Sequence, residues 1–65
     1  MFPNIYREMA AHNRMTVKQL AEHVGITPES MSNKLSGRRQ FKLSEMKKIQ
    51  TIFGGYPLDD LFRVE

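Results

Sequence analysis

The chain lacks cysteine altogether, and His12 and His23 are its only histidines. Without cysteine there is no disulfide and no thiolate ligand, and two scattered histidines make no metal cluster, so we expect neither a metal nor a cofactor. No apolar run approaches the ~20 residues of a membrane span, and the first residues lack the features of a signal peptide. We therefore expect a soluble cytoplasmic protein with no membrane partner.

A chain of 65 residues is long enough for one domain, which we expect to cover residues 1–65. The net charge of +3 is small, but the basic residues are concentrated in residues 27–48. That segment carries Lys34, Arg38, Arg39, Lys42, Lys47 and Lys48 against Glu29 and Glu45. Such a cluster is expected where a surface faces a polyanion, although a solvated lysine-rich face has the same composition.

Apolar residues recur at helical spacing throughout the chain, and no stretch alternates as a strand would. The spacing predicts helices near residues 2–12, 17–24, 27–36 and 43–53, and a last short turn after Pro57. The residues expected to face inward are Phe2, Ile5, Tyr6, Met9, Ala10, Val17, Leu20, Ala21, Val24, Met31, Leu35, Leu43, Met46, Ile49, Phe53, Leu58, Leu61 and Phe62. This pattern predicts an all-α, compact five-helix bundle.

Residues 16–37 contain two short helices joined by a tight turn. Thr16 and Thr27 are good N-cap residues, and Pro28 occupies a first helical position, where its missing N–H costs nothing. Gly25 follows the last inward residue of the first of these helices, where glycine can adopt a positive φ and end it. Because so short a turn prevents an antiparallel arrangement, the two helices must cross steeply, as in a helix-turn-helix.

The predicted helix over residues 27–36 has two faces. Met31 and Leu35 lie one turn apart on the inner face. The opposite stripe consists of Pro28, Glu29, Ser32, Asn33 and Ser36. This stripe is the surface that a helix-turn-helix inserts into the major groove of DNA.

The segment TVKQLAEHVGIT, the ending MSNKLSG of the next helix, and the downstream FKLSEMKKI and LDDLF together resemble the Xre-type DNA-binding domains. That family includes the Cro and repressor proteins of bacteriophages, and SNKLSGRRQFKLSE is especially similar to phage-type members from Gram-positive bacteria. The resemblance covers about residues 4–63. It implies a lambda repressor-like five-helix fold, sequence-specific regulation of transcription in a bacterial or phage-infected cell, and homodimers on palindromic operators.

The resemblance also implies which residues approach base edges: Thr27, Pro28, Glu29, Ser32 and Asn33. Asn33 can bond an adenine twice, and Glu29 can accept from the amino group of cytosine. Thr27 and Pro28 can contact a thymine methyl group. For Ser32 and Asn33 the alternative is ordinary helix surface, and for Glu29 it is a favourable interaction with the helix N-terminus.

The residues predicted to contact phosphate are Thr16, Lys18, Lys34, Ser36, Arg38, Arg39 and Lys42. Arg38 and Arg39 follow the third helix, where the chain should pass a DNA strand, and Lys34 flanks the groove-facing stripe. Thr16 and Lys18 open the second helix, whose free N–H groups can also bind a phosphate. Lys47 and Lys48 are expected to be solvated charges, and Phe41 is expected in the core rather than as a stacking platform.

Two pairs of positions depart from the family pattern. Ala10 and Leu35 stand where many members have an arginine and a glutamate that pair, so an apolar contact is expected in place of that ion pair. Val17 and Pro28 stand where glutamines that bind phosphate and base are common, so those contacts do not carry over.

The leading hypothesis is a DNA-binding transcriptional regulator, a Cro-like repressor that acts by occluding an operator. The alternative is a helix-turn-helix that binds protein, such as a phage antirepressor or an assembly factor. We expect no enzyme and no small-molecule substrate, because the carboxylates are dispersed and a chain this short leaves little room for a closed pocket. A homodimer on DNA is compatible with apolar residues near the C-terminus.

Overall fold

The computed structural model describes residues 2–64; Met1 and Glu65, which the expected domain includes, lie outside the described residues. Over this range the chain forms five α-helices and no strand, which confirms the all-α fold. The helices are α1 (Pro3–Ala11), α2 (Val17–Val24), α3 (Pro28–Leu35), α4 (Leu43–Ile52) and α5 (Leu58–Leu61). The predicted groove-facing helix, residues 27–36, corresponds to α3 together with its two flanking cap residues.

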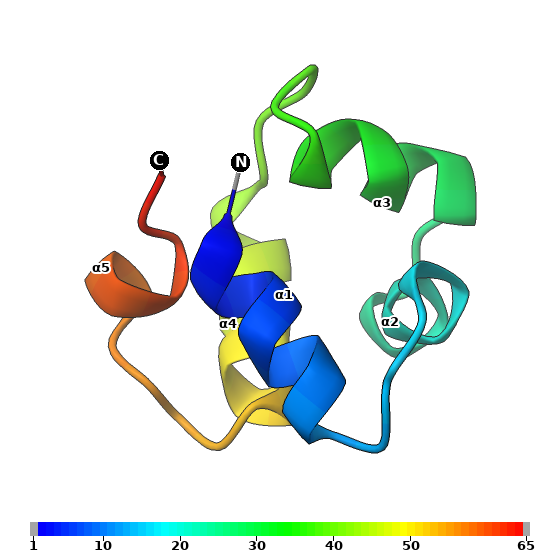
Figure 1. Ribbon diagram of the computed structural model, residues 1–65. Coiled ribbons are helices and arrows are strands. Elements are labelled where there is room, and N and C mark those ends of the chain that lie inside the picture. Colours follow the sequence, from blue (N-terminus) through cyan, green and yellow to red (C-terminus); the bar gives the residue numbers. More distant parts are fainter. Residues whose placement is uncertain (1, 65) are drawn as a thin grey trace.

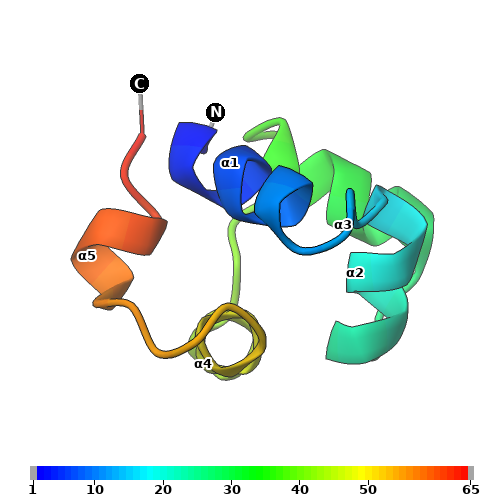
Figure 2. The ribbon, with the colours of Figure 1, turned by 60° about the horizontal axis from the view of Figure 1, so that its bottom comes forward.

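The helices surround one small core (Figure 1). α2 packs against α3 and α4, and α5 packs against α4 and α1. Seen along its axis, α4 lies between α5 on one side and α2 with α3 on the other (Figure 2). The first and last helices are joined by the Asn4 side chain, whose Nδ2 donates to the main-chain oxygen of Asp60 at 2.6 Å.

The predicted helix starts are confirmed by the hydrogen bonds at the caps. Thr16 Oγ1 accepts from the Gln19 amide at 3.1 Å, and Gln19 Oε1 accepts from the Thr16 amide at 2.9 Å, which completes a capping box for α2. Thr27 Oγ1 accepts from the Ser30 amide at 3.1 Å at the start of α3. These short helices therefore begin where local side-chain chemistry favours it.

Ten apolar side chains form the buried core: Ile5, Met9, Leu20, Ala21, Val24, Met31, Leu35, Ile49, Phe53 and Leu61. All ten belong to the set expected to face inward. Phe2, Phe41 and Phe62 are half-buried beside this core. Their rings meet edge to face, with centroids 5.2 to 5.9 Å apart, which confirms the packing role expected for Phe41.

Three residues expected inside are exposed, namely Tyr6, Ala10 and Leu43. In α4 the inward face is Glu45 and Ile49, continued by the C-cap residue Phe53 at a spacing of i, i+4 and i+8, so the face is rotated away from Leu43, which is 59% exposed. In α1 the inward residues are Ile5 and Met9, and Tyr6 and Ala10 lie on a flank of the helix that the core does not reach. The prediction that these three residues face inward, which was made from their apolar character, is therefore wrong.

Ala21 is fully buried on α2, the helix that packs against both α3 and α4. Ala21→Leu is expected to lower the free energy of unfolding by about 1–3 kcal/mol, because extra methylenes force apart helices that are already packed. Ala10→Leu is the matched control on an exposed position, with an expected change within about 0.5 kcal/mol. Urea unfolding followed by circular dichroism measures both, and equal losses for the two variants would contradict this account of the core.

Candidate nucleic-acid interface

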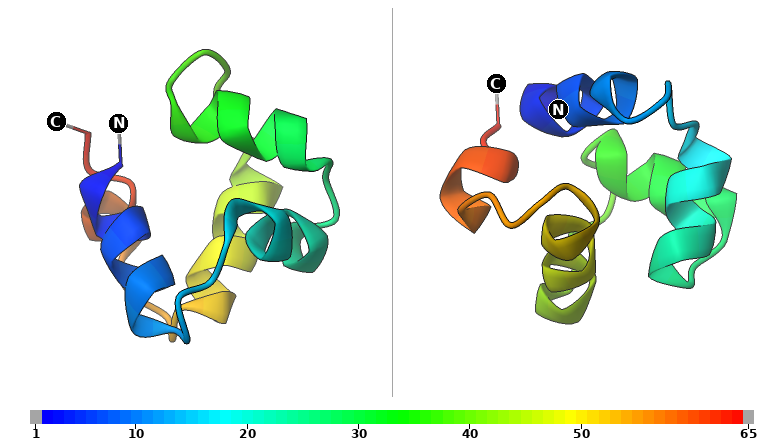
Figure 3. Two further views of the ribbon diagram at one scale, coloured as in Figure 1. Left: turned by 45° about the vertical axis from the view of Figure 1, so that its right-hand side comes forward. Right: turned by 90° about the horizontal axis from the view of Figure 1, so that it is seen from below.

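The corner between α2 and α3 has the geometry of a helix-turn-helix. Gly25 ends α2 with φ +89°, and its amide donates to the Ala21 carbonyl at 2.8 Å. Ile26, half-buried, also donates its amide to the Ala21 carbonyl, at 3.0 Å, before Thr27 caps α3. The two helices are therefore separate and cross steeply, with α3 at the edge of the molecule (Figures 1 and 3).

The residues predicted to face the bases lie along the outer side of α3. Thr27, Pro28, Glu29 and Ser32 are exposed, and Asn33 is half-buried. Met31 and Leu35, on the opposite side of the helix, are fully buried. The polar stripe on this side of the helix, here called the outer stripe, is therefore accessible to a ligand over its whole length; it consists of Pro28, Glu29, Ser32, Asn33 and Ser36. Its contact with DNA stays a prediction.

The end of α3 is tied to the loop that follows it through the main-chain oxygen of Asn33. This oxygen accepts from the Arg38 amide at 2.9 Å, the Arg39 amide at 3.2 Å and the Ser36 hydroxyl at 3.1 Å. Within residues 2–64 the side chain of Asn33 makes no hydrogen bond to the protein, so its amide group is available to a base edge. These hydrogen bonds fix the first residues of the loop next to the end of α3.

The basic residues predicted to contact phosphate are mostly at the surface. Lys18, on the first turn of α2, is exposed, as are Arg38, Arg39 and Lys42 in the loop between α3 and α4. This loop projects beyond the end of α3 (Figure 3, left). Four positive side chains are therefore accessible on the segments before and after the outer stripe.

The two predicted phosphate contacts that carry hydroxyl groups, Thr16 and Ser36, are also exposed. Each hydroxyl already has a structural role: Thr16 caps α2, and Ser36 donates to the Asn33 main-chain oxygen. Any phosphate contact by these residues must therefore be made alongside a cap or loop hydrogen bond.

Lys34 departs from the predicted phosphate contacts. It is 8% exposed, and its Nζ lies 2.6 Å from Oε1 and 2.5 Å from Oε2 of Glu45, itself 7% exposed. The reason is its position in α3: Met31, Lys34 and Leu35 are spaced at i, i+3 and i+4 and share the inward face. We therefore withdraw Lys34 from the residues expected to bind phosphate.

Glu45 keeps its charge inside the fold. Burial by itself would raise the pKa of this carboxyl, but the hydrogen bond from Lys34, the hydrogen bond from the Lys42 amide and the positive charges of both lysines together hold the pKa below its ordinary value of 4.5. The Lys42 amide donates to Glu45 Oε1 at 2.8 Å. The same carboxylate thus binds α3 and the last residue of the loop.

Sequence reasoning missed Glu45 and Lys48. Lys48 was expected to be a solvated charge, but its Nζ donates to the main-chain oxygen of Val24 at 3.2 Å, at the end of α2. The signal for Glu45 was present, since a glutamate three residues after Lys42 is the N3 position of a capping box. No local signal indicated that its partner would be Lys34.

The Ala10 and Leu35 positions also differ from the expectation. Leu35 is fully buried, whereas Ala10 is exposed, so Leu35 is packed in the core without Ala10 as a buried partner. The buried ion pair of this protein joins the neighbouring residue Lys34 to α4 instead.

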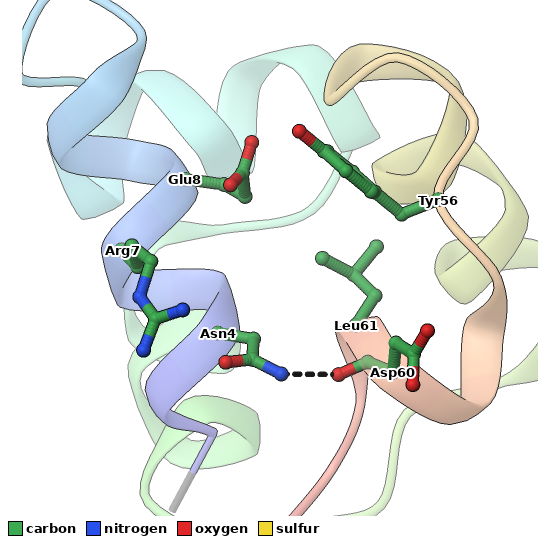
Figure 4. A pocket seen from close by; sticks show the side chains of 6 residues that line it. All are labelled: Asn4, Arg7, Glu8, Tyr56, Asp60 and Leu61. Carbon is green, nitrogen blue, oxygen red and sulfur yellow. Dashed lines mark hydrogen bonds between the residues drawn. The ribbon is translucent and has the colours of Figure 1, made fainter.

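A small pocket lies between α1 and the segment leading into α5 (Figure 4). Its volume is about 150 Å³, and its lining residues are Asn4, Arg7, Glu8, Tyr56, Asp60 and Leu61. Glu8 and Tyr56 face it from opposite sides (Figure 4). None of the residues predicted to face DNA lines this pocket, so it is not part of the candidate interface.

Within residues 2–64 no three histidine, aspartate or glutamate side chains are grouped closely enough to hold a metal ion. None of the five helices in that range is both long and apolar enough to cross a bilayer.

Among known families, the Cro/C1-type HTH DNA-binding domain matches the chain over residues 7–65. The match covers the corner between α2 and α3, the outer stripe, and the loop that carries Arg38, Arg39 and Lys42, called the basic loop below. It confirms the resemblance to Cro and repressor proteins. Searches of curated proteins and of solved structures find no match.

Because the pKa of Glu45 is lowered in the folded protein, its contribution to stability is complete above pH 4.5 and is lost as the pH falls through the lower, folded-state pKa. Glu45→Gln is expected to cost about 3–5 kcal/mol of unfolding free energy near neutral pH, because it leaves the buried Lys34 charge without a counter-charge. As the pH falls through the lowered pKa, below 4.5, the difference from the wild type should shrink.

Urea titrations across this pH range, at low temperature, measure the difference. Glu22→Gln, at an exposed position of α2, is the control and should show neither effect. A stability difference between Glu45→Gln and the wild type that does not shrink at any pH below 4.5 would rule out the ion pair as its source.

Proposed function

We propose that this chain, which belongs to the Cro/C1-type HTH DNA-binding domain family, is a sequence-specific transcriptional regulator. In this proposal it reads the major groove of double-stranded DNA with α3. The observation that supports this most directly is the exposed polar stripe of α3, with exposed basic residues in the segments on both sides of the corner. A helix with this arrangement can place base-reading groups in the groove while the flanking charges lie near the phosphates.

Base recognition in this proposal comes from Thr27, Pro28, Glu29, Ser32 and Asn33. Asn33 is the strongest of them, because its amide can donate to and accept from the major-groove edge of adenine at once. Glu29 accepts from the amino group of cytosine and disfavours other bases at that position. Thr27 and Pro28 supply apolar contacts to thymine methyl groups.

Affinity comes from the backbone contacts of Lys18, Arg38, Arg39 and Lys42. The hydroxyls of Thr16 and Ser36 and the free amides at the start of α2 support them. Each phosphate neutralised releases counterions, so binding should weaken steeply as salt rises. The absence of Lys34 from this set lowers the expected salt dependence by about one phosphate contact.

The regulatory effect we propose is repression by occlusion, in which the bound protein blocks polymerase at a promoter, without enzymatic activity. A homodimer would read two half-sites about 34 Å apart on one face of the duplex. Tyr56 and Val64, which are 47% and 64% exposed, are the apolar side chains near the C-terminus that a second copy could cover. The cytoplasm is the proposed compartment because the DNA target lies there in bacteria.

Selection of preferred sites from random duplex DNA is the decisive experiment. The expected result is one preferred sequence, with specific binding roughly 10³-fold or more tighter than non-specific binding. No enrichment at low salt would contradict the proposal and favour the protein-binding alternative.

Asn33→Ala is expected to weaken binding to the selected site by about 1–3 kcal/mol and to leave binding to a scrambled duplex unchanged, because only a base contact is lost. Competition gel shifts with the two duplexes measure the ratio. An equal loss on both duplexes would show that Asn33 does not read a base.

Arg38→Gln is expected to reduce the slope of log affinity against log salt by about 0.9, the value of one phosphate contact. Lys47→Gln is the matched control: it removes the same charge from an exposed position of α4 and should leave the slope unchanged. Fluorescence anisotropy over a range of salt concentrations gives both slopes. If the two variants lower the slope equally, the loop has no special role at the backbone.

A further inference from the structure

The helix that carries the outer stripe is attached to α4 by side chains alone. No Cα atom of α3 lies within 8 Å of a Cα atom of α4 in the described chain. Besides the shared apolar core, one buried link across this distance is polar: Lys34 Nζ, near the end of α3, meets both carboxylate oxygens of Glu45, in the first turn of α4. Hydrogen bonds to both oxygens restrain the position of the Lys34 ammonium, and with it the end of α3, relative to α4.

The loop between the two helices is held at both of its ends. Its first residues donate to the main-chain oxygen of Asn33, through the Arg38 and Arg39 amides. Its last residue, Lys42, donates its amide to Glu45 Oε1 at 2.8 Å. One carboxylate therefore ties both the end of α3 and the end of the basic loop to α4.

We propose that Glu45 is a positioning residue for DNA recognition, which acts through Lys34 on the orientation of α3 and through the Lys42 amide on the path of the basic loop. This inference rests on the proposed function. Glu45 is buried, so its effect on DNA is exerted through the segments it holds and not by contact.

Stability alone gives a poor reason for such a pair. Replacing a buried ion pair by hydrocarbon of similar volume is often neutral or stabilising, because the charges no longer have to be desolvated. A repacked hydrocarbon contact tolerates small shifts between helices, whereas the lysine ammonium must stay within hydrogen-bond distance of the carboxylate oxygens. The pair is therefore expected to determine where α3 points more than whether the chain folds.

Paired substitutions separate these two roles, since they avoid leaving a single buried charge. Lys34→Met with Glu45→Gln removes both charges but keeps an oxygen that can accept from the Lys42 amide. Lys34→Met with Glu45→Met removes this acceptor as well. Urea unfolding, the ratio of affinities for selected and scrambled duplexes, and the salt slope on the scrambled duplex are measured for each.

The first pair of substitutions is expected to unfold at the wild-type urea concentration or above, to lose roughly tenfold in preference for the selected duplex, and to keep the wild-type salt slope. The second pair should lose more preference, because the loop is released too. Wild-type preference in a folded double variant would overturn the proposal. A slope lowered by about 0.9 would also overturn it, because Lys34 would then be a phosphate contact.

Glu45→Asp keeps the net charge and serves if the double variants do not fold. Shortening the side chain by one methylene group displaces the carboxylate, so the preference for the selected duplex should fall while affinity for the scrambled duplex stays the same. Unchanged preference in this variant would contradict the positioning role. If the wild type itself prefers no sequence, the proposed function fails. If the wild type has a preference that none of these variants alters, only the positioning role of Glu45 fails.

Discussion

α3 has only eight residues, and these both pack against the core and form a polar surface. Its inward face consists of Met31, Lys34 and Leu35, and one of these three is charged. A lysine in that position is tolerable only with a counter-charge, because an isolated buried charge is very costly. Glu45 supplies it, and the inward face of α4 accordingly carries Glu45 and Ile49, with Leu43 at the surface.

Most of the fold followed from local chemistry that a sequence displays directly. Thr16 and Thr27 cap their helices, Pro28 takes a first helical position, and Gly25 adopts the positive φ that ends α2. Each of these depends on a few neighbouring residues, so no knowledge of the tertiary structure was needed. The same holds for the outer stripe of α3, which was obtained as the side opposite Met31 and Leu35.

The ion pair could not be predicted in this way. Assigning faces by hydropathy places charged residues outside and apolar ones inside, so it sent Lys34 and Glu45 to the surface and Leu43 to the core. The two partners are 11 residues apart in the chain, with a helix end and a loop between them, so no helical periodicity relates them. A phosphate contact and a buried pair are equally compatible with a lysine near the end of such a helix, and only the three-dimensional arrangement distinguishes them.

With Lys34 neutralised inside the fold, Glu29 is the one charged residue on the outer stripe of α3. The positive charges proposed to contact phosphate lie outside that helix, on Lys18, Arg38, Arg39 and Lys42. If the proposed function holds, this distribution of charge assigns base discrimination to α3 and affinity for the DNA backbone to other segments. Lysines on a groove-facing helix would attract any sequence through the phosphates, since that attraction does not depend on the bases. A nearly uncharged reading surface leaves discrimination to hydrogen bonds and methyl contacts, while affinity comes from the loop and α2. The accuracy of such a surface depends on how firmly α3 and the loop are held relative to each other, and Glu45 is the residue that holds both.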